Sequence, residues 1–404
     1  MGTKELGREF IVFPNGGDPK AIQRAMPDAD FVMFEKSYGD YGTNPGLVVS
    51  PLFQGVSSRV YNDNIFEHKI VQSFRQRVKP VILTRAGYPS QPPERFMNAD
   101  AARLGMAECG AFSGGGAFLI RPYFGIYHDA LNEYRRFFET HPQLYAGLET
   151  YAPTAVLAFL EQQWLGNAPH VGTVQSLTDR LTSEHVLFDF VSEFRLEGSV
   201  LDRYDSVVAA DLRVVSQEQL GEVEEYVSQG GHLIVAGDFA VQDEFLRDRP
   251  AESSPLLVLI ADNHGETMRH GGGRVTVLSS VESVPAALGQ TASVLACADA
   301  LLGAQVKANA FQSIAEVPPR IVLHLVNYNV PLGVDAPPPT AIDEIELLVP
   351  LPKGMRTASA RAFAPDRDGG TTLRMENVEN CARIAVPGLQ IYQVVELTFE
   401  PVQD

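Results

Sequence analysis

The chain has 404 residues, of which 45% are hydrophobic and 20% charged, a composition typical of a globular protein. Its formal net charge of -18 repels phosphate backbones and anionic lipid surfaces, so we expect neither nucleic acid nor a membrane as a partner. At roughly 100–200 residues per domain, the length predicts two to four domains.

The cysteines and the N-terminal residues exclude further classes of protein. Cys109, Cys297 and Cys381 are widely spaced and form no CxxC pair, which disfavours a disulfide framework or a zinc site. We expect each to be a small buried side chain. The start of the sequence lacks the apolar segment of a secretory signal, and no apolar run approaches the ~18 residues of a membrane-spanning helix. These features predict a soluble cytoplasmic protein without a metal ion or cofactor.

The first 150 residues alternate short apolar runs with segments of helical spacing, the pattern of a parallel α/β unit. A closed (β/α)₈ barrel needs eight strands, and this region offers three or four. It is therefore either a small open sheet or the back part of a barrel. The predicted strands lie at 10–14, 31–34, 79–85 and 117–121, and the predicted helices at 19–26, 66–77, 98–112 and 126–138.

Glu35 follows the apolar run at 31–34 and precedes a loop rich in tyrosine and glycine. In an α/β barrel, a carboxylate at the carboxyl end of a strand points into the site that the loops build. The alternative interpretation is an ordinary solvated residue at a strand end.

Residues 151–304 repeat the alternation of strand and helix and predict a doubly wound domain of the flavodoxin or amidotransferase shape. Ser216 is predicted to be the N-cap of a helix that ends before Gly230. The predicted strands lie at 154–159, 186–190, 206–210, 232–236 and 271–278, and the predicted helices at 174–182, 216–228 and 292–302.

Two glycine clusters in this region raise the question of phosphate binding. Neither Gly230-Gly231 nor Gly271-Gly272-Gly273 fits GxGxxG or a P-loop, so we interpret both as structural. An amidotransferase needs a nucleophilic cysteine at a strand-to-helix turn, and the strand ending at Ala236 continues with Gly237 and Asp238 instead. Glutaminase activity is therefore disfavoured.

Residues 305–404 predict an antiparallel β-sandwich, because short strands recur between turns rich in proline, glycine and asparagine. His324 lies within an alternating apolar strand and has no second metal ligand near it, so we interpret it as structural. The predicted strands lie at 320–328, 344–349, 357–363, 371–375, 381–386 and 391–397. The fold class is thus α/β plus all-β, with a partial barrel segment (1–150), a doubly wound domain (151–304) and a sandwich (305–404).

This order resembles the back portion of family 42-type β-galactosidases and related glycoside hydrolases. In that family a (β/α)₈ catalytic barrel precedes a trimerisation domain and a C-terminal sandwich. The stretches that carry the resemblance are 152–160, 204–237, 272–278 and 322–328.

The resemblance implies that Glu35 is the catalytic nucleophile, because the family's nucleophile is a glutamate late in the barrel. The strand that carries the family's general acid has no counterpart here, so the acid would come from a missing segment or a partner chain. Asn15, Tyr38 and Arg85 are candidates for binding the sugar, and Arg85 could also keep Glu35 ionised. Each of these three is alternatively a loop residue without a special role. Glu67 and Glu108 lie inside helical patterns and are expected to be surface or helix-packing residues.

Two hypotheses of different classes remain. The first is that the chain is the nucleophile-bearing part of a retaining glycosidase. The second is that it is a non-catalytic protein with a vestigial barrel, which oligomerises or binds carbohydrate. A partial barrel exposes sheet edges, so we expect association with a partner chain or as a homo-oligomer, for which the resemblance implies a trimer.

Overall fold

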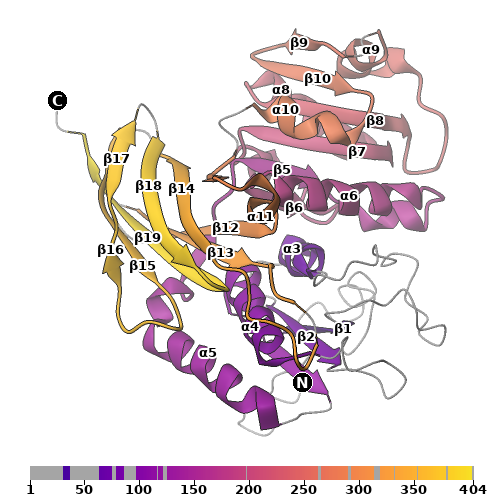
Figure 1. The fold of residues 1–404 in the computed structure, drawn as a ribbon. Helices are drawn as coiled ribbons and strands as arrows, with labels where there is room; N and C mark the ends of the chain where they lie inside the picture. Colours follow the sequence, from indigo (N-terminus) through magenta and orange to yellow (C-terminus); the bar gives the residue numbers. More distant parts are fainter. Residues whose placement is uncertain are drawn as a thin grey trace, which may run out of the picture.

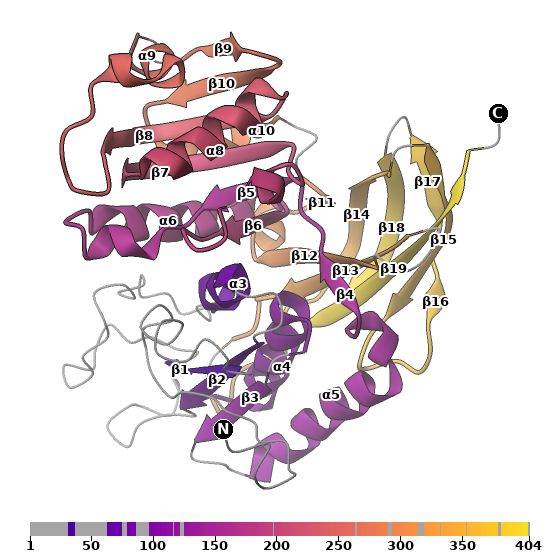
Figure 2. The same cartoon turned by 180° about the vertical axis from the view of Figure 1, so that it is seen from behind.

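The computed structural model has a small parallel sheet at the start of the chain, a doubly wound domain, and a β-sandwich (Figure 1). In both views the helix α4 lies between the small sheet and the sandwich (Figure 2). The structure describes residues 31–36, 63–74, 79–85, 97–115, 117–121, 125–196, 198–262, 265–289, 293–313, 319–331, 333–352, 354–378 and 381–402.

The first part contains a three-stranded parallel sheet in the order β1-β2-β3. The strand predicted at 79–85 is confirmed to the residue. Asn98 caps α4 by accepting a hydrogen bond from the amide of Ala101, and Gly114 ends that helix at a φ of 58°. The elements are β1 (Phe31–Lys36), α3 (Ile65–Phe74), β2 (Lys79–Arg85), α4 (Ala99–Ser113), β3 (Ala117–Arg121) and α5 (His128–Thr140).

The doubly wound domain has a six-stranded sheet in the order β6-β5-β7-β8-β10-β9, with only β9 antiparallel. Ser216 caps α8 as predicted, and it forms a capping box with Gln219. The elements are β5 (Thr154–Leu157), α6 (Pro169–Ser183), β6 (Phe188–Val191), α7 (Gly198–Leu201), β7 (Ser206–Val214), α8 (Gln217–Ser228), β8 (His232–Gln242), α9 (Pro255–Asp262), β9 (Thr267–His270), β10 (Gly273–Leu278) and α10 (Val284–Leu288).

The sandwich packs a four-stranded antiparallel sheet, β11-β14-β18-β17, against a six-stranded one, β16-β15-β19-β13-β12-β4. Both β4 and β11 precede residue 305 in the sequence but pair with sandwich strands. The elements are β4 (Leu148–Thr150), β11 (Leu295–Cys297), α11 (Ala300–Gly303), β12 (Val306–Ser313), β13 (Arg320–Asn327), β14 (Ile342–Pro350), β15 (Met355–Phe363), β16 (Thr371–Thr372), β17 (Met375–Val378), β18 (Cys381–Leu389) and β19 (Tyr392–Pro401).

The helix predicted over 292–302 is wrong. This alanine-rich stretch forms the strand β11 and the short helix α11, because Leu295 and Cys297 pair with β14. Pairing at the sheet edge outweighs the modest helical preference of alanine. Short 3₁₀ helices complete the chain: η3 (Gly125–Tyr127), η4 (Pro142–Leu144), η5 (Leu160–Gln163), η6 (Ala251–Ser253) and η7 (Val281–Ser283).

One hydrophobic core joins the first part to the sandwich. Leu104 and Phe112 of α4 share a buried cluster with Val322 of β13 and Val394 of β19. The six-stranded sheet of the sandwich is thus covered on one face by its partner sheet and on the other by α4 and α5, which explains why β13 is buried from Ile321 to Asn327.

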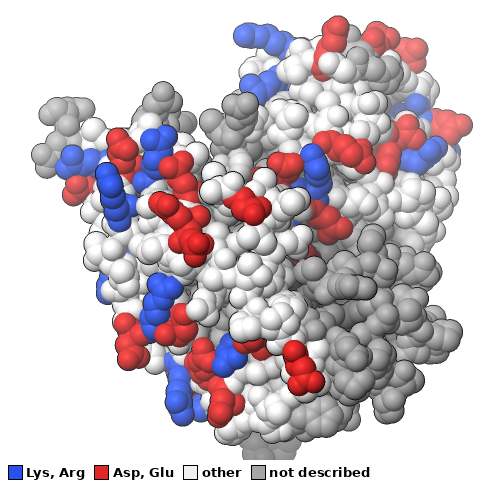
Figure 3. Space-filling view, viewed as in Figure 1, with Lys and Arg blue, Asp and Glu red and all other residues white. Residues whose placement is uncertain are grey.

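The surface carries charges of both signs. On the face shown in Figure 3, lysines and arginines alternate with aspartates and glutamates over the sandwich and the doubly wound domain. In the described part of the chain, no helix is long and apolar enough to cross a membrane.

Candidate functional site

The carboxyl ends of β1, β2 and β3 meet at one edge of the small sheet. Glu35 of β1 pairs in register with Leu83 of β2, and Arg85 pairs with Arg121 of β3. Standard strand geometry therefore puts the Cα atoms of Glu35 and Arg85 about 8 Å apart. The backbone register thus brings together two of the predicted residues. The side chains of Glu35 and Arg85, and all of Asn15 and Tyr38, lie outside the residues that the structure describes.

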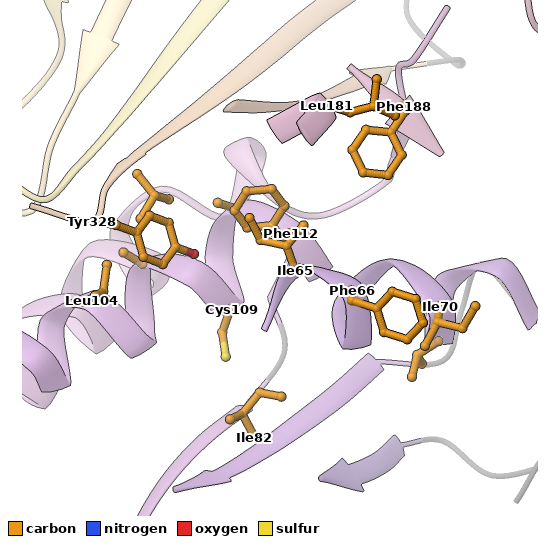
Figure 4. Close-up of a cluster of buried hydrophobic side chains, with 14 of the residues drawn as sticks. Ile65, Phe66, Ile70, Ile82, Leu104, Cys109, Phe112, Leu181, Phe188 and Tyr328 are labelled. Atoms are coloured by element: carbon orange, nitrogen blue, oxygen red, sulfur yellow. The ribbon is translucent and has the colours of Figure 1, made fainter. Parts of the chain in front are cut away.

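Two helices, α3 and α4, pack on one face of the small sheet. Ile82 of β2 is fully buried, and Figure 4 shows Cys109 of α4 pointing towards it. Gly105 of α4 lies against the ring of Phe118 so closely that a Cβ atom would sit 2.3 Å from it, so this helix approaches β3 tightly. On the opposite face, Met33, Val81 and Leu83 form a separate buried cluster. The strands therefore pack against α3 and α4 on one face, and side chains of β1 and β2 contact one another on the other.

Cys109 confirms the expectation of a buried cysteine, whereas Cys297 and Cys381 are half-buried. All three are free thiols. Burial raises the pKa of the Cys109 thiol well above its usual value, so it is not a reactive thiolate.

Glu108 is completely buried, which confirms helix packing, the second of its two expected roles. Its carboxylate accepts hydrogen bonds from the backbone and side-chain amides of Asn64, both at 2.9 Å, and from the hydroxyl of Tyr328 at 2.6 Å. His68 Nε2 lies 3.4 Å from the same carboxylate. Glu108 therefore joins α3 and α4 to the segment after β13, and it is inaccessible to solvent.

A cavity of about 50 Å³ lies where the three parts meet. Lys69 of α3 reaches into this junction and donates hydrogen bonds to the carbonyl of Phe188 at 2.5 Å and to Oδ1 of Asn309 at 3.0 Å. Burial lowers the pKa of Lys69 to about 8. Ligand pockets run to ≈ 300–1,000 Å³, so this cavity is too small for a sugar ring.

In the doubly wound domain, polar side chains occupy the crevice at the carboxyl ends of the strands. Its strand order switches between β5 and β7, the place where such sheets bind ligands. Gln162 bonds both backbone groups of Val214 there, and Asn167 donates to Gln162 and to the carbonyl of Asp211. His170 bonds the amide of Phe159 and the carbonyl of Ala210, and burial lowers its pKa to about 4. These side chains therefore occupy the crevice and bond the backbone of the strands that form it.

The glycine clusters are structural, as predicted. A Cβ atom on Gly273 would lie 2.2 Å from the carbonyl oxygens of both Val227 and Gly231, so the close approach of β10 to the end of α8 requires glycine. After Ala236, strand β8 continues to Gln242 and makes no nucleophile elbow.

His324 is a structural histidine, as predicted. It is fully buried, its Nδ1 lies 2.7 Å from the hydroxyl of Tyr392, and burial lowers its pKa to about 3. Across the described ranges, no group of three histidine, cysteine or acidic side chains is placed to hold a metal ion.

Sequence reasoning missed Lys69 and the Glu108–Asn64–Tyr328 contact. A lysine or glutamate within a helical pattern gives no local signal of burial, because its partners lie on distant segments.

No protein family model matches the chain by sequence, and no curated protein does either. The similarity is structural, and it is to glycoside hydrolases. Over most of its length the chain has the fold of the GH42 β-galactosidases.

Three solved structures illustrate this similarity. The β-galactosidase from Bacillus circulans sp. alkalophilus matches with a TM-score of 0.59 and 12% identity, covering 94% of this chain and 65% of that one. A catalytic mutant of Gan42B, a GH42 β-galactosidase from G. stearothermophilus, matches at 0.58 and 10% identity, covering 93% and 61%. α-L-Fucosidase isoenzyme 2 from Paenibacillus thiaminolyticus matches at 0.54 and 14% identity, covering 80% and 61%. The chain thus spans less than two thirds of each of these proteins, and identities this low show the fold alone.

Proposed function

We propose that this chain is the nucleophile-bearing part of a retaining glycoside hydrolase, with Glu35 as the nucleophile. The observation that carries the proposal is the position of Glu35 at the carboxyl end of β1, in a parallel sheet whose three strands end together. Similarity to glycoside hydrolases over most of the chain supports treating this sheet as the back part of a (β/α)₈ barrel.

In this mechanism, a carboxylate oxygen of Glu35 attacks the anomeric carbon while the bond to the leaving oxygen breaks. Arg85 lies one strand away and stabilises the ionised form of Glu35, which keeps it nucleophilic. A second carboxyl group, roughly 5–5.5 Å from the first, protonates the leaving oxygen and then activates water. That group belongs to a segment outside the described strands, in a partner chain or in a longer form of the protein.

The substrate class follows from the structural relatives. Two of the three similar proteins act on galactosides according to their names, so a β-galactoside is the first substrate to test, and an α-L-fucoside is the second. Asn15 and Tyr38 are proposed to bind the sugar hydroxyls, with Tyr38 also able to stack on the ring.

Association completes the proposal. The edge strands β1 and β3 of the small sheet are proposed to meet barrel strands supplied by a partner chain, or the doubly wound domain is proposed to assemble three copies. Sedimentation equilibrium measures this directly, and a monomer at all concentrations would contradict it.

The decisive experiment separates the nucleophile from the missing acid. A 2,4-dinitrophenyl 2-deoxy-2-fluoro-glycoside has a leaving group that departs without a proton, so it reports the nucleophile alone. We expect the chain to acquire one glycosyl group, found by mass spectrometry on the peptide containing Glu35. The second carboxyl group is not needed for this step.

Glu35→Gln should abolish the labelling, and Glu344→Gln, at an exposed position of β14, should leave it unchanged. Labelling that persists in Glu35→Gln would reject the nucleophile assignment. No labelling of the wild-type chain by any tested glycoside would favour the alternative, a non-catalytic protein that oligomerises or binds carbohydrate.

A further inference from the structure

The connection between β13 and β14, residues 328–341, leaves the sandwich and packs against the first part of the chain. The amide of Thr340 donates to the carbonyl of Asn329 at 3.0 Å, which closes the base of this connection. Tyr328, at its start, is buried in the cluster that joins the sandwich to α4, and its hydroxyl bonds α4 directly. We call residues 333–340 the sandwich loop.

Asn98 holds the sandwich loop on the N-terminus of α4. Its side-chain amide donates hydrogen bonds to the carbonyls of Pro331, at 3.0 Å, and of Gly333, at 3.1 Å. The oxygen of the same side chain accepts the N-cap hydrogen bond from the amide of Ala101 at 2.9 Å. One side chain therefore fixes both the start of the helix and the start of the loop.

The N-terminus of α4 lies on the side of the small sheet where the strands end. The helix connects two parallel strands, β2 and β3, so it runs antiparallel to them. Cys109 of α4 points towards Ile82 of β2, which puts these two residues at the same level (Figure 4). From that level the helix rises about 16 Å to Asn98. Strand β2 rises only about 10 Å to Arg85, so Asn98 and the loop stand beyond the strand ends.

The segment after β3 reaches the same place and carries an exposed apolar side chain, as the sandwich loop does. The hydroxyl of Tyr127 in η3 donates to the carbonyl of Met97 at 3.0 Å, so η3 lies beside the N-terminus of α4. Next to it, Ile126 is 53% exposed, and Val334 of the sandwich loop is 52% exposed. The consecutive prolines 337–339 restrict the backbone of the loop, so it loses little entropy when it contacts a ligand.

We propose that Val334 and Ile126 contact the leaving group of the substrate and favour an apolar, aromatic one. This inference rests on the proposed function, with the bond cleaved at Glu35. A sugar whose anomeric carbon lies at the strand ends extends its leaving group away from the sheet, towards the segments that stand beyond it. Covering these two exposed side chains then stabilises the bound substrate. The sandwich thus contributes specificity to a site whose nucleophile belongs to the first part of the chain.

Two reagents that transfer the same sugar separate the leaving group from the nucleophile. In 2,4-dinitrophenyl 2-deoxy-2-fluoro-β-galactoside the leaving group is an aromatic ring, and in 2-deoxy-2-fluoro-β-galactosyl fluoride it is a single fluoride. The double variant Val334→Ser, Ile126→Ser should be labelled about tenfold more slowly by the aryl reagent and at an unchanged rate by the fluoride. Val402→Ser, at a position that is 53% exposed after β19, should leave both rates unchanged.

Asn98→Asp tests the anchor of the loop. The carboxylate still accepts the N-cap hydrogen bond from Ala101, but it cannot donate to the carbonyls of Pro331 and Gly333. We expect the same selective slowing with the aryl reagent, and an unchanged rate with the fluoride shows that the variant is folded.

The two reagents also distinguish failure of this inference from failure of the proposed function. If wild type is labelled at Glu35 but the variants slow both reagents equally, or neither, the inference is overturned and the nucleophile assignment stands. If neither reagent labels wild type, the proposed function is overturned, and the role of the sandwich loop in it falls as well.

Discussion

The small sheet and the doubly wound sheet differ in the residues that lie at the carboxyl ends of their parallel strands. In the doubly wound sheet, Gln162, Asn167 and His170 occupy the crevice at the switch point and bond the backbone around it. In the small sheet, the three strands end at Glu35, Arg85 and Arg121, and the register alone brings these positions together. Parallel strands bring their carboxyl ends to one edge in both sheets, but a catalytic site also requires polar side chains that are not already bonded within the fold.

The two sheets also differ in what holds them. The doubly wound sheet has its own hydrophobic cluster on one face, built from β5, β7, β8, α8 and α9, whereas its other face contributes to the large cluster of the first part and the sandwich. The small sheet shares its core with the sandwich and depends on the buried carboxylate of Glu108 to join α3 and α4 to Tyr328. Interface substitutions should therefore affect the first part more than the doubly wound domain.

Glu108→Ala tests this dependence and should have the largest effect. It leaves the Asn64 amides and the Tyr328 hydroxyl without their acceptor in a dry core, which should lower the free energy of unfolding by about 4 kcal/mol. Urea unfolding followed by circular dichroism measures the loss. Glu139→Ala, at an exposed position of α5, is the matched control and should change stability by less than about 0.5 kcal/mol. Equal losses in the two variants would show that the Glu108 contacts add nothing.

Gly273→Ala probes the doubly wound sheet instead. The added methyl would collide with the carbonyl oxygens of Val227 and Gly231, so we expect a loss of about 3 kcal/mol. Gly221→Ala, in α8, meets open space and should be neutral or slightly stabilising. If Gly273→Ala were harmless, the glycine cluster would need an explanation other than packing.

Acid should weaken the switch-point network. The folded pKa of His170 is about 4, below its ordinary value of 6.5, so the unfolded chain binds the proton first as the pH falls. The contribution of neutral His170 to the free energy of unfolding is complete above the unfolded pKa and is lost as the pH drops towards 4. The loss reaches about 2 kcal/mol at pH 5.

The comparison that isolates this group is His170→Gln against wild type at pH 7 and pH 5. Asp63, whose pKa burial raises to about 7, shifts stability in the opposite direction, but it is present in both proteins. We expect the variant to be less stable at pH 7 and to have a smaller acid-dependent loss. An unchanged acid-dependent loss would mean that His170 is not held neutral in the folded state.

The sequence by itself determined the local elements of this protein. Alternation and turn residues placed most sandwich strands, and the N-cap at Ser216 and the strand at 79–85 were predicted correctly. The position of Glu35 at a strand end was also readable, because it depends on a short apolar run and the residue that ends it. Such signals lie within a few residues of one another.

Only the tertiary structure decided which polar side chains are buried and where segments change partners. Glu108 and Lys69 are interior because helices from the first part meet the sandwich and β6, and residues 295–297 form a strand because β14 offers an edge. Burial and pairing of this kind depend on contacts between residues far apart in the sequence, and local periodicity does not indicate which distant residues come into contact.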